Sequence, residues 1–385
     1  MENRKVALFA TNFVSFSQTF IYDEVRSHKK YAVDVYSLYR MNKDIFPYEN
    51  VHSFFPADSL KMKIEGKFCE ITSLSPTRKK LIANGGYSLI HAHFGTGSIY
   101  ALPFADSADL PLVVTFHGYD VPILKTYRRF FPEFWRYWLL SGKMFRRVDL
   151  FLAASDELNK MLVELGAPAE KVKTWRLGVE IPEISKLPER SGKRIIMVGR
   201  FVEKKGFEYA IEAFAKVIKS GADAVLDIIG DGPLKNRYIS MIKKLNIENK
   251  VIFHGVKKHR EVLDMILNSD ILLAPSVVAT NGDRESGILV VKEAGARSVP
   301  AIGTIHGGIP EIIDEGKTGF LVNEKDVKAL AERITLLLGN EILRQKMGAA
   351  ARKKMENEYS LPDRVEVLES YYDSVIEKFK ERKND

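Results

Sequence analysis

Two carboxylates stand eight positions apart in the stretch DRESGILVVKEAGARSVPAIG, and their spacing suggests a chemical role. Glu285 lies in a polar loop after the apolar run ILLAPS, and Glu293 is expected about two turns into the following helix. Eight residues of helix advance about 12 Å along the axis. That length is of the order of the separation between hexose and ribose in a nucleotide sugar, so each carboxylate could accept hydrogen bonds from a hydroxyl pair.

The residues between the two glutamates offer main-chain donors. The amides of Ser286, Gly287, Ile288 and Leu289 are expected to begin the helix. Unpaired N–H groups at a helix start attract phosphate or sugar oxygens. Gly287 also removes a side chain where a ligand must come close.

A second loop supplies positive charge. Arg200 and Lys205 flank the turn in VGRFVEKKG, and Gly206 opens an amphipathic pattern that runs to about Ile218. Two cations beside a helix start suit a diphosphate better than a single carboxylate. A solvated basic turn would be the simpler interpretation of this loop alone. We favour the anion site because the loops after IIMVG, LDIIG, ILLAPS and AIG are all expected at the carboxyl ends of parallel strands.

The elements that must position these residues are short β-branched runs that alternate with helical patterns. The first half contains KVALFAT, AVDVYSL, YSLIHAHF, LPLVVTFHG and VDLFLAAS, and the second contains RIIMVGR, AVLDIIGDG, KVIFHGV, DILLAPS, SVPAIGT and TGFLVN. This alternation predicts α/β domains with parallel, doubly wound sheets. Two prolines in a polar setting interrupt it at residues 178–193. We therefore expect domains at residues 1–180 and 194–361, a linker at 181–193, and a helix at 362–381 that packs back on the first domain.

Length and composition agree with two globular domains. The chain has 385 residues, 45% of them hydrophobic and 28% charged, which excludes the disordered classes. Its one cysteine, Cys69, excludes an intrachain disulfide and favours a reducing compartment. The first residues read as a strand rather than a signal peptide, and glycines, histidines and a proline in residues 87–105 argue against a membrane span. We expect a cytoplasmic protein.

A basic, aromatic segment concentrates part of the net charge of +8. Residues 125–147 carry seven basic residues against one acidic residue, Glu133, with eight aromatic residues interleaved. This composition is typical of a segment that lies on an anionic membrane surface. An amphipathic helix that packs its rings into the first domain explains it equally well. RNA binding is the weakest of the three readings, because no recognised nucleic-acid module surrounds the segment, and we expect no nucleic-acid partner.

The ordered motifs VGRFVEKKG, IIGDGP, ESGILVVKEAGA and GGIPEIIDEGKTGFLV resemble the carboxyl-terminal domain of glycosyltransferase family 4, also described as glycosyl transferases group 1. The resemblance covers about residues 194–338. The amino half resembles members that build extracellular polysaccharide or lipopolysaccharide more loosely, through SQTFIYDEV, HAHFGTGSIYALPFA and TFHGYDV. It departs from the family in having TNFVSFSQTF in place of the usual Gly-rich loop after the first strand.

The resemblance implies the GT-B fold, with two Rossmann-like domains that face each other across a cleft, and a retaining transfer of sugar. It implies that the second domain binds a nucleotide-sugar donor and the first a glycan or lipid-linked acceptor. The implied catalytic residues are His117 and Glu285, and Glu293 is the implied ribose ligand. The implied diphosphate-binding residues are Arg200, Lys205, Gly287, Ile288 and Leu289.

Histidines in the first half raise the question of a metal. His91 and His93 lie on one face of an expected strand, but no third ligand cluster is evident, so core or acceptor-cleft roles are preferred. Asp120, in TFHGYD, is assigned to the acceptor cleft together with His93. The chain also contains no Asp-x-Asp, the pair that commonly holds a divalent cation on a sugar nucleotide. We therefore expect no cofactor and no metal, with Arg200, Lys205 and helix starts neutralising the leaving diphosphate.

Other functions remain open at this point. Nucleotide-sugar epimerases and glycogen phosphorylases share the two-domain architecture, and a noncatalytic sugar-binding protein of this fold is conceivable. A nicotinamide dehydrogenase fits less well, because VGRFVEKKG is not Gly-x-Gly-x-x-Gly. The leading hypothesis is a retaining glycosyltransferase that moves a hexosyl-type sugar to a lipid-linked or growing glycan acceptor.

Overall fold

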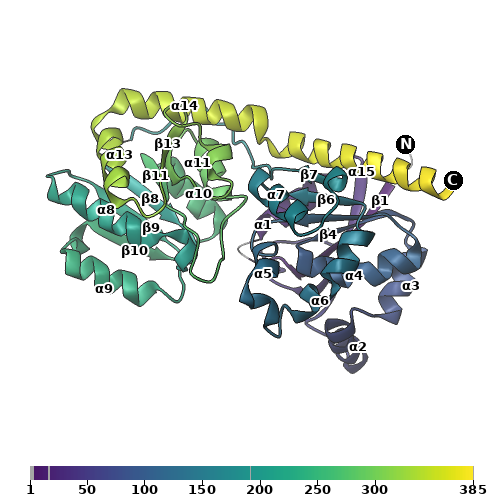
Figure 1. Ribbon diagram of the computed structural model, residues 1–385. Helices are drawn as coiled ribbons and strands as arrows, with labels where there is room; N and C mark the ends of the chain where they lie inside the picture. Colours follow the sequence, from purple (N-terminus) through teal and green to yellow (C-terminus); the bar gives the residue numbers. More distant parts are fainter. Residues whose placement is uncertain (1–3, 16–17, 191, 385) are drawn as a thin grey trace. The chain divides into compact units, whose positions relative to one another are not determined.

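A computed structural model describes residues 4–15, 18–190 and 192–384. Ser17, the first residue of the motif SQTFIYDEV, and Ser191, in the expected linker, lie outside these residues. The chain divides into two compact units, which are described separately here (Figure 1). Unit 1 comprises Met1–Gly178 and Leu361–Asp385, and unit 2 comprises Val179–Ser360.

Unit 1 is built on a seven-stranded sheet with the order β3-β2-β1-β4-β5-β6-β7. Every neighbouring pair in it is parallel. The strand order reverses between β1 and β4, and ligands of such sheets bind at the carboxyl ends beside that reversal. The strands are β1 (Arg4–Phe13), β2 (Tyr31–Arg40), β3 (Val51–Phe55), β4 (Tyr87–His93), β5 (Leu112–Phe116), β6 (Leu150–Ala153) and β7 (Val172–Thr174).

Helices cover both faces of this sheet (Figure 1). The largest buried cluster of unit 1 joins strand residues such as Phe9 and Val114 to helix residues such as Leu102 and Met144. The helices are α1 (Thr19–Ser27), α2 (Leu60–Thr72), α3 (Pro76–Asn84), α4 (Gly95–Ala108), α5 (Pro122–Lys125), α6 (Trp135–Arg147), α7 (Asp156–Glu164) and α15 (Leu361–Asn384), with 3-10 turns η1 (Tyr127–Phe130) and η2 (Ala169–Lys171).

The carboxyl-terminal helix α15 belongs to unit 1, although it follows unit 2 in the sequence. Glu369 accepts hydrogen bonds from the backbone N–H groups of Lys29 and Lys30 at 2.8 and 2.9 Å. The Tyr372 hydroxyl lies 2.7 Å from His91 Nδ1 on β4. Buried polar groups need such partners, so these contacts fix the helix against α1 and β4.

Unit 2 repeats the architecture with six parallel strands in the order β10-β9-β8-β11-β12-β13. Its strand order reverses between β8 and β11. Apolar side chains of β8, β9 and β11 pack with those of α8 and α13 in one buried cluster. The strands are β8 (Arg194–Val198), β9 (Val225–Ile229), β10 (Val251–Gly255), β11 (Ile271–Ala274), β12 (Ala301–Thr304) and β13 (Gly319–Val322).

The helices of unit 2 connect these strands. They are α8 (Phe207–Lys219), α9 (Lys235–Leu245), α10 (His259–Leu267), α11 (Leu289–Gly295), α12 (Ile309–Ile312), α13 (Val327–Gly339) and α14 (Glu341–Glu358), with 3-10 turns η3 (Glu203–Lys205) and η4 (Glu248–Lys250). Within the expected linker, Arg190 donates to the backbone oxygens of Arg297 and Ser298 at 2.9 and 2.8 Å. This part of the linker is therefore fastened to unit 2.

The predicted fold class of two doubly wound α/β domains is confirmed, and all eleven predicted strands are present. Two strands were not predicted, β3 and β7, which are five and three residues long. They form the two edges of the unit 1 sheet and bury one residue each, Phe54 and Val172, so neither VHSFF nor VKT shows the apolar run of an inner strand. The boundary between the units falls at Gly178, within three residues of the start of the predicted linker.

Candidate active site

The loops after β8 and β11 meet at the strand reversal of unit 2. Gly206, between η3 and α8, has φ 63°, and a Cβ atom there would lie 1.8 Å from the Pro275 carbonyl oxygen. A side chain is thus excluded, and the turn can approach the end of β11 closely. The Val277 N–H donates to the Lys204 carbonyl at 2.9 Å, which ties the two loops together. The loops after β8 and β11, two of the four predicted to converge, therefore do meet.

Glu285 is paired with two lysines at this point. Its Oε2 lies 3.0 Å from Lys205 Nζ, and its Oε1 lies 3.3 Å from Lys204 Nζ. Lys204 also contacts Asp283 Oδ1 at 3.2 Å. Burial raises the pKa of Glu285, but Lys205 and Lys204 outweigh burial and lower it to about 2. The carboxylate is therefore ionised, and it holds both ammonium groups beside the turn.

Two residues that the sequence reading did not identify support Glu285. His306 Nε2 lies 3.0 Å from the backbone nitrogen of Glu285, and His306 Nδ1 lies 2.7 Å from Glu324 Oε1. Because the backbone N–H must donate, Nε2 accepts and the ring proton stands on Nδ1. Glu324 also accepts from the Val278 N–H at 3.0 Å. His306 opens the motif HGGIP, so its position was visible, but its partner was not.

The helix that follows Glu285 is shorter than predicted. It runs from Leu289 to Gly295, and residues 285–288 are not helical. The estimate that eight helical residues separate Glu285 from Glu293 is therefore wrong. The Ile288 N–H bonds back to the Ser286 carbonyl at 3.2 Å in a local turn. Gly287, Ile288 and Leu289 do stand at the entry of the helix, as predicted.

The remaining predicted residues of unit 2 lie on neighbouring elements. Arg200 follows β8 and is exposed, and its guanidinium has no recorded partner within the described residues. Glu293, on α11, lies 2.7 Å from His259 Nε2 at the start of α10 through its Oε1 atom. The Glu293 side chain is 14% exposed. One carboxylate edge is therefore occupied by the imidazole, and some of the side chain still meets solvent.

In unit 1, His117 follows β5 and belongs to a chain of buried polar groups. Its Nε2 lies 2.9 Å from His93 Nδ1, and His93 Nε2 lies 3.2 Å from Glu24 Oε1 on α1. The His117 ring packs between Phe20 and Phe94, with centroid distances of 4.6 and 4.7 Å. Burial lowers the pKa of His117 well below its usual value. His117 is therefore a neutral imidazole.

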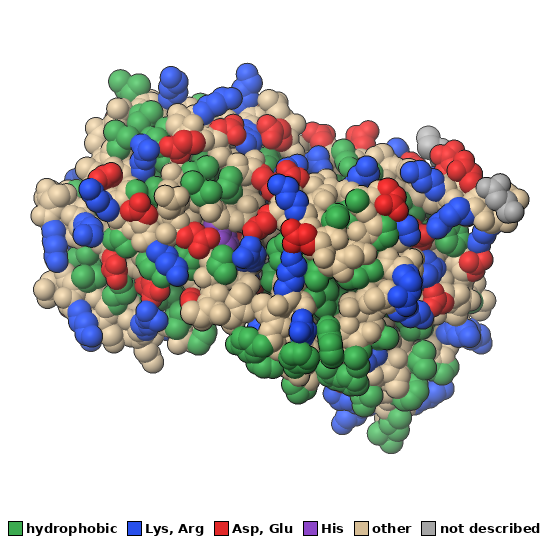
Figure 2. Space-filling model, viewed as in Figure 1, with side chains coloured by type: hydrophobic (Ala, Val, Ile, Leu, Met, Phe, Trp, Pro, Cys, Tyr) green, Lys and Arg blue, Asp and Glu red, His purple; other side chains and the backbone are tan. Residues whose placement is uncertain are grey.

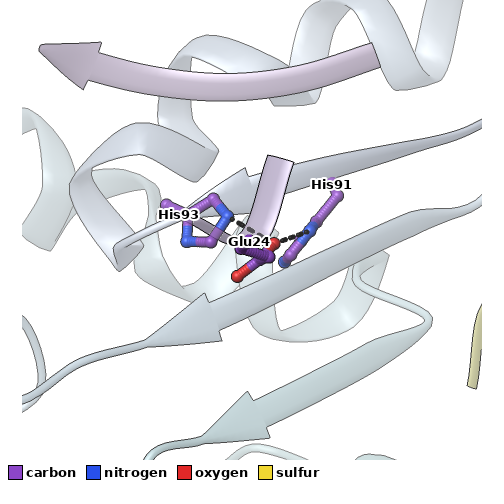
Figure 3. Close-up of side chains that lie close together, drawn as sticks. All are labelled: Glu24, His91 and His93. Carbon is purple, nitrogen blue, oxygen red and sulfur yellow. Dashed lines mark hydrogen bonds and ion pairs between the residues drawn. The ribbon is translucent and has the colours of Figure 1, made fainter. Parts of the chain in front are cut away.

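Glu24 lies between His91 and His93, the two histidines of β4 (Figure 3). One ligand-capable atom of each of the three side chains lies within 4.8 Å of the others, and all three residues are buried. The expectation that the two histidines lack a third potential ligand is therefore wrong. His91 is already satisfied, because its Nε2 contacts Thr115 Oγ1 and its Nδ1 contacts the Tyr372 hydroxyl, both at 2.7 Å.

Asp120 is enclosed in the protein. Its Oδ2 accepts from the Gly95 N–H at 2.9 Å, which is the first residue of α4, and its Oδ1 accepts from the Gly118 N–H at 3.0 Å. Burial raises its pKa to about 6, although the backbone donors oppose the shift. Asp120 and His93 are both 0% exposed. Their side chains lack the exposure that the predicted acceptor contacts require.

A cavity of about 520 Å³ opens instead at the carboxyl ends of β1 and β2 in unit 1. Polar and aromatic side chains line it, a mixture that suits sugar hydroxyls and sugar ring faces. Its lining includes Asn12, Gln18, Thr96, Tyr100, Tyr119 and Arg136. The cavity was not predicted from the sequence, because its walls come from segments of unit 1 that are far apart along the chain.

Five of the eight rings of residues 125–147 are exposed, whereas Tyr137 and Phe145 are buried in the core of unit 1. Phe130, Trp135 and Trp138 are 58%, 47% and 37% exposed. Helix α2 adds a stripe of exposed apolar residues, Leu60, Ile64, Phe68 and Ile71. Arg136 joins the two elements, since it donates to Glu70 O at 2.8 Å and to Ser73 Oγ at 2.7 Å. We call the exposed apolar residues of α2, η1 and α6 the apolar surface.

Hydrophobic side chains gather on this side of unit 1, where Figure 1 places α2, α5 and α6 (Figure 2). The basic residues that border the apolar surface differ in whether they are paired or exposed. Arg147 is paired with Asp106 and Asp149 at 2.8 and 3.0 Å, whereas Arg146 is exposed. In the described part of the chain, no helix has the length and apolar character that a membrane crossing needs.

Comparison with protein-family models yields two matches. A model described as Glycosyltransferase Family 4 matches residues 18–182, and a model described as Glycosyl transferases group 1 matches residues 180–354. The first match covers most of unit 1, and the second covers nearly all of unit 2.

Curated relatives are similar over part or most of the chain. A putative colanic acid biosynthesis glycosyltransferase, WcaL, of Escherichia coli (strain K12) is 34% identical over 63% of this chain and 59% of its own length. The amylovoran biosynthesis glycosyltransferase AmsK of Erwinia amylovora is 32% identical over 64% and 60%. The chain thus spans about three fifths of these relatives. An N-acetyl-alpha-D-glucosaminyl L-malate synthase of Bacillus anthracis is 28% identical over 91% and 90%.

Solved structures share the fold at lower identity. Anabaena Alr3699/HepE, in complex with UDP and glucose, has a TM-score of 0.75 at 17% identity and covers 97% of this chain and 100% of its own. Sucrose-phosphate synthase from Thermosynechococcus elongatus has a TM-score of 0.75 at 16% identity, covering 98% and 100%. These likenesses show the fold alone, which is the GT-B fold predicted from the sequence.

Proposed function

Since the chain belongs to the glycosyltransferases of family 4, the group 1 glycosyl transferases, we propose that it transfers a sugar from a nucleotide donor to a growing glycan. The transferred group is a hexosyl-type sugar, and its anomeric configuration is retained. The acceptor is lipid-linked or a growing chain in the synthesis of a surface polysaccharide or glycolipid. The names of the colanic acid and amylovoran relatives support this assignment.

The observation that carries the proposal is the charge cluster at the strand reversal of unit 2. Lys204 and Lys205 are held beside the turn by Glu285, and Arg200 is exposed next to them. An ammonium group has three donors. Lys205 can therefore keep its bond to Glu285 and still donate to a phosphate oxygen. With Arg200 it would form a clamp for the diphosphate, aided by the amides at Gly287 and Leu289. The third predicted amide, that of Ile288, already donates to the Ser286 carbonyl.

The two glutamates take different parts of the donor. Glu285, fixed at its backbone by His306, would bind hydroxyl groups of the transferred sugar. Glu293 would bind the ribose, with His259 orienting its carboxylate. Alr3699/HepE has been solved with UDP and with UDP-glucose, so a uridine donor is the first candidate. The clamp supplies positive charge from side chains, and we propose that the transfer requires no metal and no other cofactor.

Unit 1 would bind the acceptor. Its cavity at the ends of β1 and β2 has the size and the polar, aromatic lining of a sugar site. Arg136 lines the cavity and also holds α2, so the cavity borders the apolar surface. His117, at the end of β5, is the proposed catalytic residue of unit 1, and Glu285 is that of unit 2.

The apolar surface would place this cavity at a membrane. Its rings and the α2 stripe are exposed, and Lys61, Lys63, Lys67 and Arg146 add positive charge. Apolar side chains enter the headgroup region while cations contact anionic lipid. We propose reversible docking at the cytoplasmic face of the cytoplasmic membrane, where a lipid-linked acceptor would be within reach.

Donor cleavage tests the proposed reaction without knowledge of the acceptor. The full chain is incubated with UDP-, GDP- or ADP-sugars, with and without a crude lipid extract, and the sugar product is followed by NMR. We expect one donor to be consumed and the newly formed anomer to have the donor's configuration. Release of the opposite anomer would contradict retention. An exchange between two nucleotide sugars, with no sugar released, would favour the epimerase alternative.

A further inference from the structure

A line of three buried side chains runs from α1 to the end of β5. Glu24 Oε1 lies 3.2 Å from His93 Nε2, and His93 Nδ1 lies 2.9 Å from His117 Nε2. We propose that Glu24 and His93 form a relay that fixes the tautomer of His117 and leaves its Nδ1 atom as a hydrogen-bond acceptor. Glu24 and His93 would be positioning residues, and the catalytic part of this inference rests on the proposed function.

The direction of the relay follows from the carboxylate. In the proposed relay Glu24 is an ionised carboxylate, which only accepts hydrogen bonds, so His93 Nε2 carries the proton that faces it. His93 is neutral in this relay, so it has no second ring proton, and its Nδ1 accepts from His117 Nε2–H. The neutral His117 ring then has a bare Nδ1. Each hydrogen bond determines the proton position in the next, so one ionised carboxylate at Glu24 is enough to fix the tautomers of His93 and His117.

The surroundings of His117 Nδ1 indicate what a hydrogen-bond acceptor at this atom could bind. The atom is buried and has no hydrogen-bond partner in the part of the chain that the structure describes. Phe20 and Phe94 flank the ring and offer no hydrogen-bonding groups. An unpaired buried acceptor is unfavourable unless a ligand satisfies it. We therefore expect Nδ1 to accept a hydrogen bond from a hydroxyl group of the donor or acceptor sugar.

The neighbouring histidine is connected separately. His91 contacts Thr115 through Nε2 and Tyr372 through Nδ1, and its Nδ1 lies 3.7 Å from Glu24 Oε1. Both of its ring nitrogens therefore have partners outside the relay. Burial lowers the pKa of His91 well below its usual value. A neutral His91 does not supply a counter-charge to Glu24, which leaves the His93 N–H as the recorded donor to that carboxylate.

A metal ion at the same residues would produce the opposite polarity. Glu24, His91 and His93 could each offer one ligand atom to a transition metal. A metal on His93 Nε2 would leave the ring proton on Nδ1, which would then donate to His117 Nε2. His117 would carry its proton on Nδ1 and become a donor at that atom. A protonated His93 would have the same effect, so the tautomer of His117 decides between these states.

The test is long-range proton–nitrogen NMR of the full chain with ¹⁵N-labelled histidine, combined with metal analysis of the purified protein. The Glu24→Gln variant replaces the carboxylate by an amide that can donate as well as accept. Thr115→Val is the matched control, because it removes a buried partner of His91 and leaves the relay intact. Thermal melting establishes that each variant is folded.

In the wild type we expect a protonated Nε2 and a bare Nδ1 on His117, unchanged in Thr115→Val. In Glu24→Gln the preference should weaken, and kcat should fall at least about tenfold, part of the 10²–10⁴-fold that a positioned acid–base group contributes. KM should change far less. A proton on Nδ1 of wild-type His117, or a stoichiometric metal that survives dialysis, would overturn the relay. The expected tautomer in a chain that cleaves no nucleotide sugar would instead reject the proposed function.

Discussion

The ion pair of Glu285 and Lys205 is proposed to order the site before a ligand binds and to remain when Lys205 contacts phosphate. Burial alone would keep the Glu285 carboxyl protonated, but the two lysines lower its pKa to about 2. The pairing also restrains Lys205, a side chain that would otherwise lose up to about 2 kcal/mol of rotational freedom when it binds phosphate. We therefore regard the pair as preorganised for an anion.

Substitution of the two glutamates should affect donor binding and turnover differently. Glu293→Ala should weaken the binding of free nucleoside diphosphate, because the ribose loses its partner. Glu285→Ala should mainly reduce turnover and should lower diphosphate affinity less than Glu293→Ala does, because both lysines remain although Glu285 no longer restrains them. Calorimetric titration with UDP and steady-state kinetics separate these effects. Equal losses of UDP affinity in both variants would reject the assignment.

Arg200 and Lys205 should each matter to the donor. A charge-assisted hydrogen bond contributes about 1.5–3 kcal/mol, so Arg200→Ala or Lys205→Ala should lose roughly ten- to hundredfold in donor affinity or rate. Arg237→Ala is a suitable control, because its side chain is 63% exposed and paired with Glu208 on α8. A loss in the control as large as in the clamp variants would point to a general effect of positive charge.

Removal of divalent metal tests whether the side-chain clamp alone neutralises the diphosphate. EDTA should leave the wild-type rate unchanged if side chains alone neutralise the leaving diphosphate. Rates are measured before and after dialysis against EDTA, with melting curves to establish that the protein stays folded. Full inactivation that a divalent ion reverses would show that a metal carries part of the charge.

At the residue scale, the sequence pointed to the groups that we propose face a ligand, but not to the groups that contact them from other segments. Glu285, Lys205 and His117 stand in motifs after strands, where the fold places ligands. Glu24 and His93 are 69 positions apart, and His306 reaches Glu285 over 21 positions. Hydrogen bonds across such separations leave no periodic pattern in the sequence. These partners required the structure.

At the scale of elements, hydrophobic periodicity predicted eleven of the described strands and α8 well. It failed at the two edge strands of unit 1 and where the exposure of an element is unusual. Helix α2 exposes Leu60 to the extent of 73% and Ile64 to 62%, contrary to the usual burial of an apolar stripe. The sequence shows that a stripe exists but not which way it faces. The basic, aromatic segment was ambiguous for the same reason, and five of its eight rings are exposed.

The exposed stripe and rings make membrane docking testable. Ile64→Ser, Trp135→Ser and Arg146→Glu should each reduce cosedimentation with anionic vesicles, because exposed apolar area and cations both contribute to binding. High salt should weaken binding by the wild type, since surface charges are screened within about 8 Å at physiological ionic strength. Ile342→Ser is the control, because Ile342 is 80% exposed on α14 of unit 2.

The structure also separates arginines that could contact lipid from those that cannot. Arg136 and Arg147 are committed to intramolecular partners. Changes at these two positions should lower the melting temperature, whereas Arg146→Glu should not. Equal, negligible binding to neutral and anionic vesicles by the wild type would reject docking and leave the apolar surface without the proposed role.

At the scale of the whole chain, two domains of one fold class follow from the repeated alternation of strands and helices. The last helix is less predictable, because a helical pattern does not specify the surface on which it packs. Here α15 returns to unit 1, where Glu369 accepts from two backbone amides and Trp175 donates to the Arg364 carbonyl at 2.9 Å. These contacts join segments that are hundreds of residues apart in the sequence.

The central claim is that unit 2 binds a nucleotide-sugar donor through the cluster of Arg200, Lys205 and Glu285. The most direct measurement is a thermal-shift panel of UDP-, GDP- and ADP-sugars with the wild type and Lys205→Ala. A ligand at 100 times its Kd stabilises the folded state by about 2.7 kcal/mol. We predict that the sugars of one nucleotide raise the Tm of the wild type, and that Lys205→Ala requires higher concentrations for the same shift. No shift with any of the three nucleotides, or an equal response in the variant, would contradict the account.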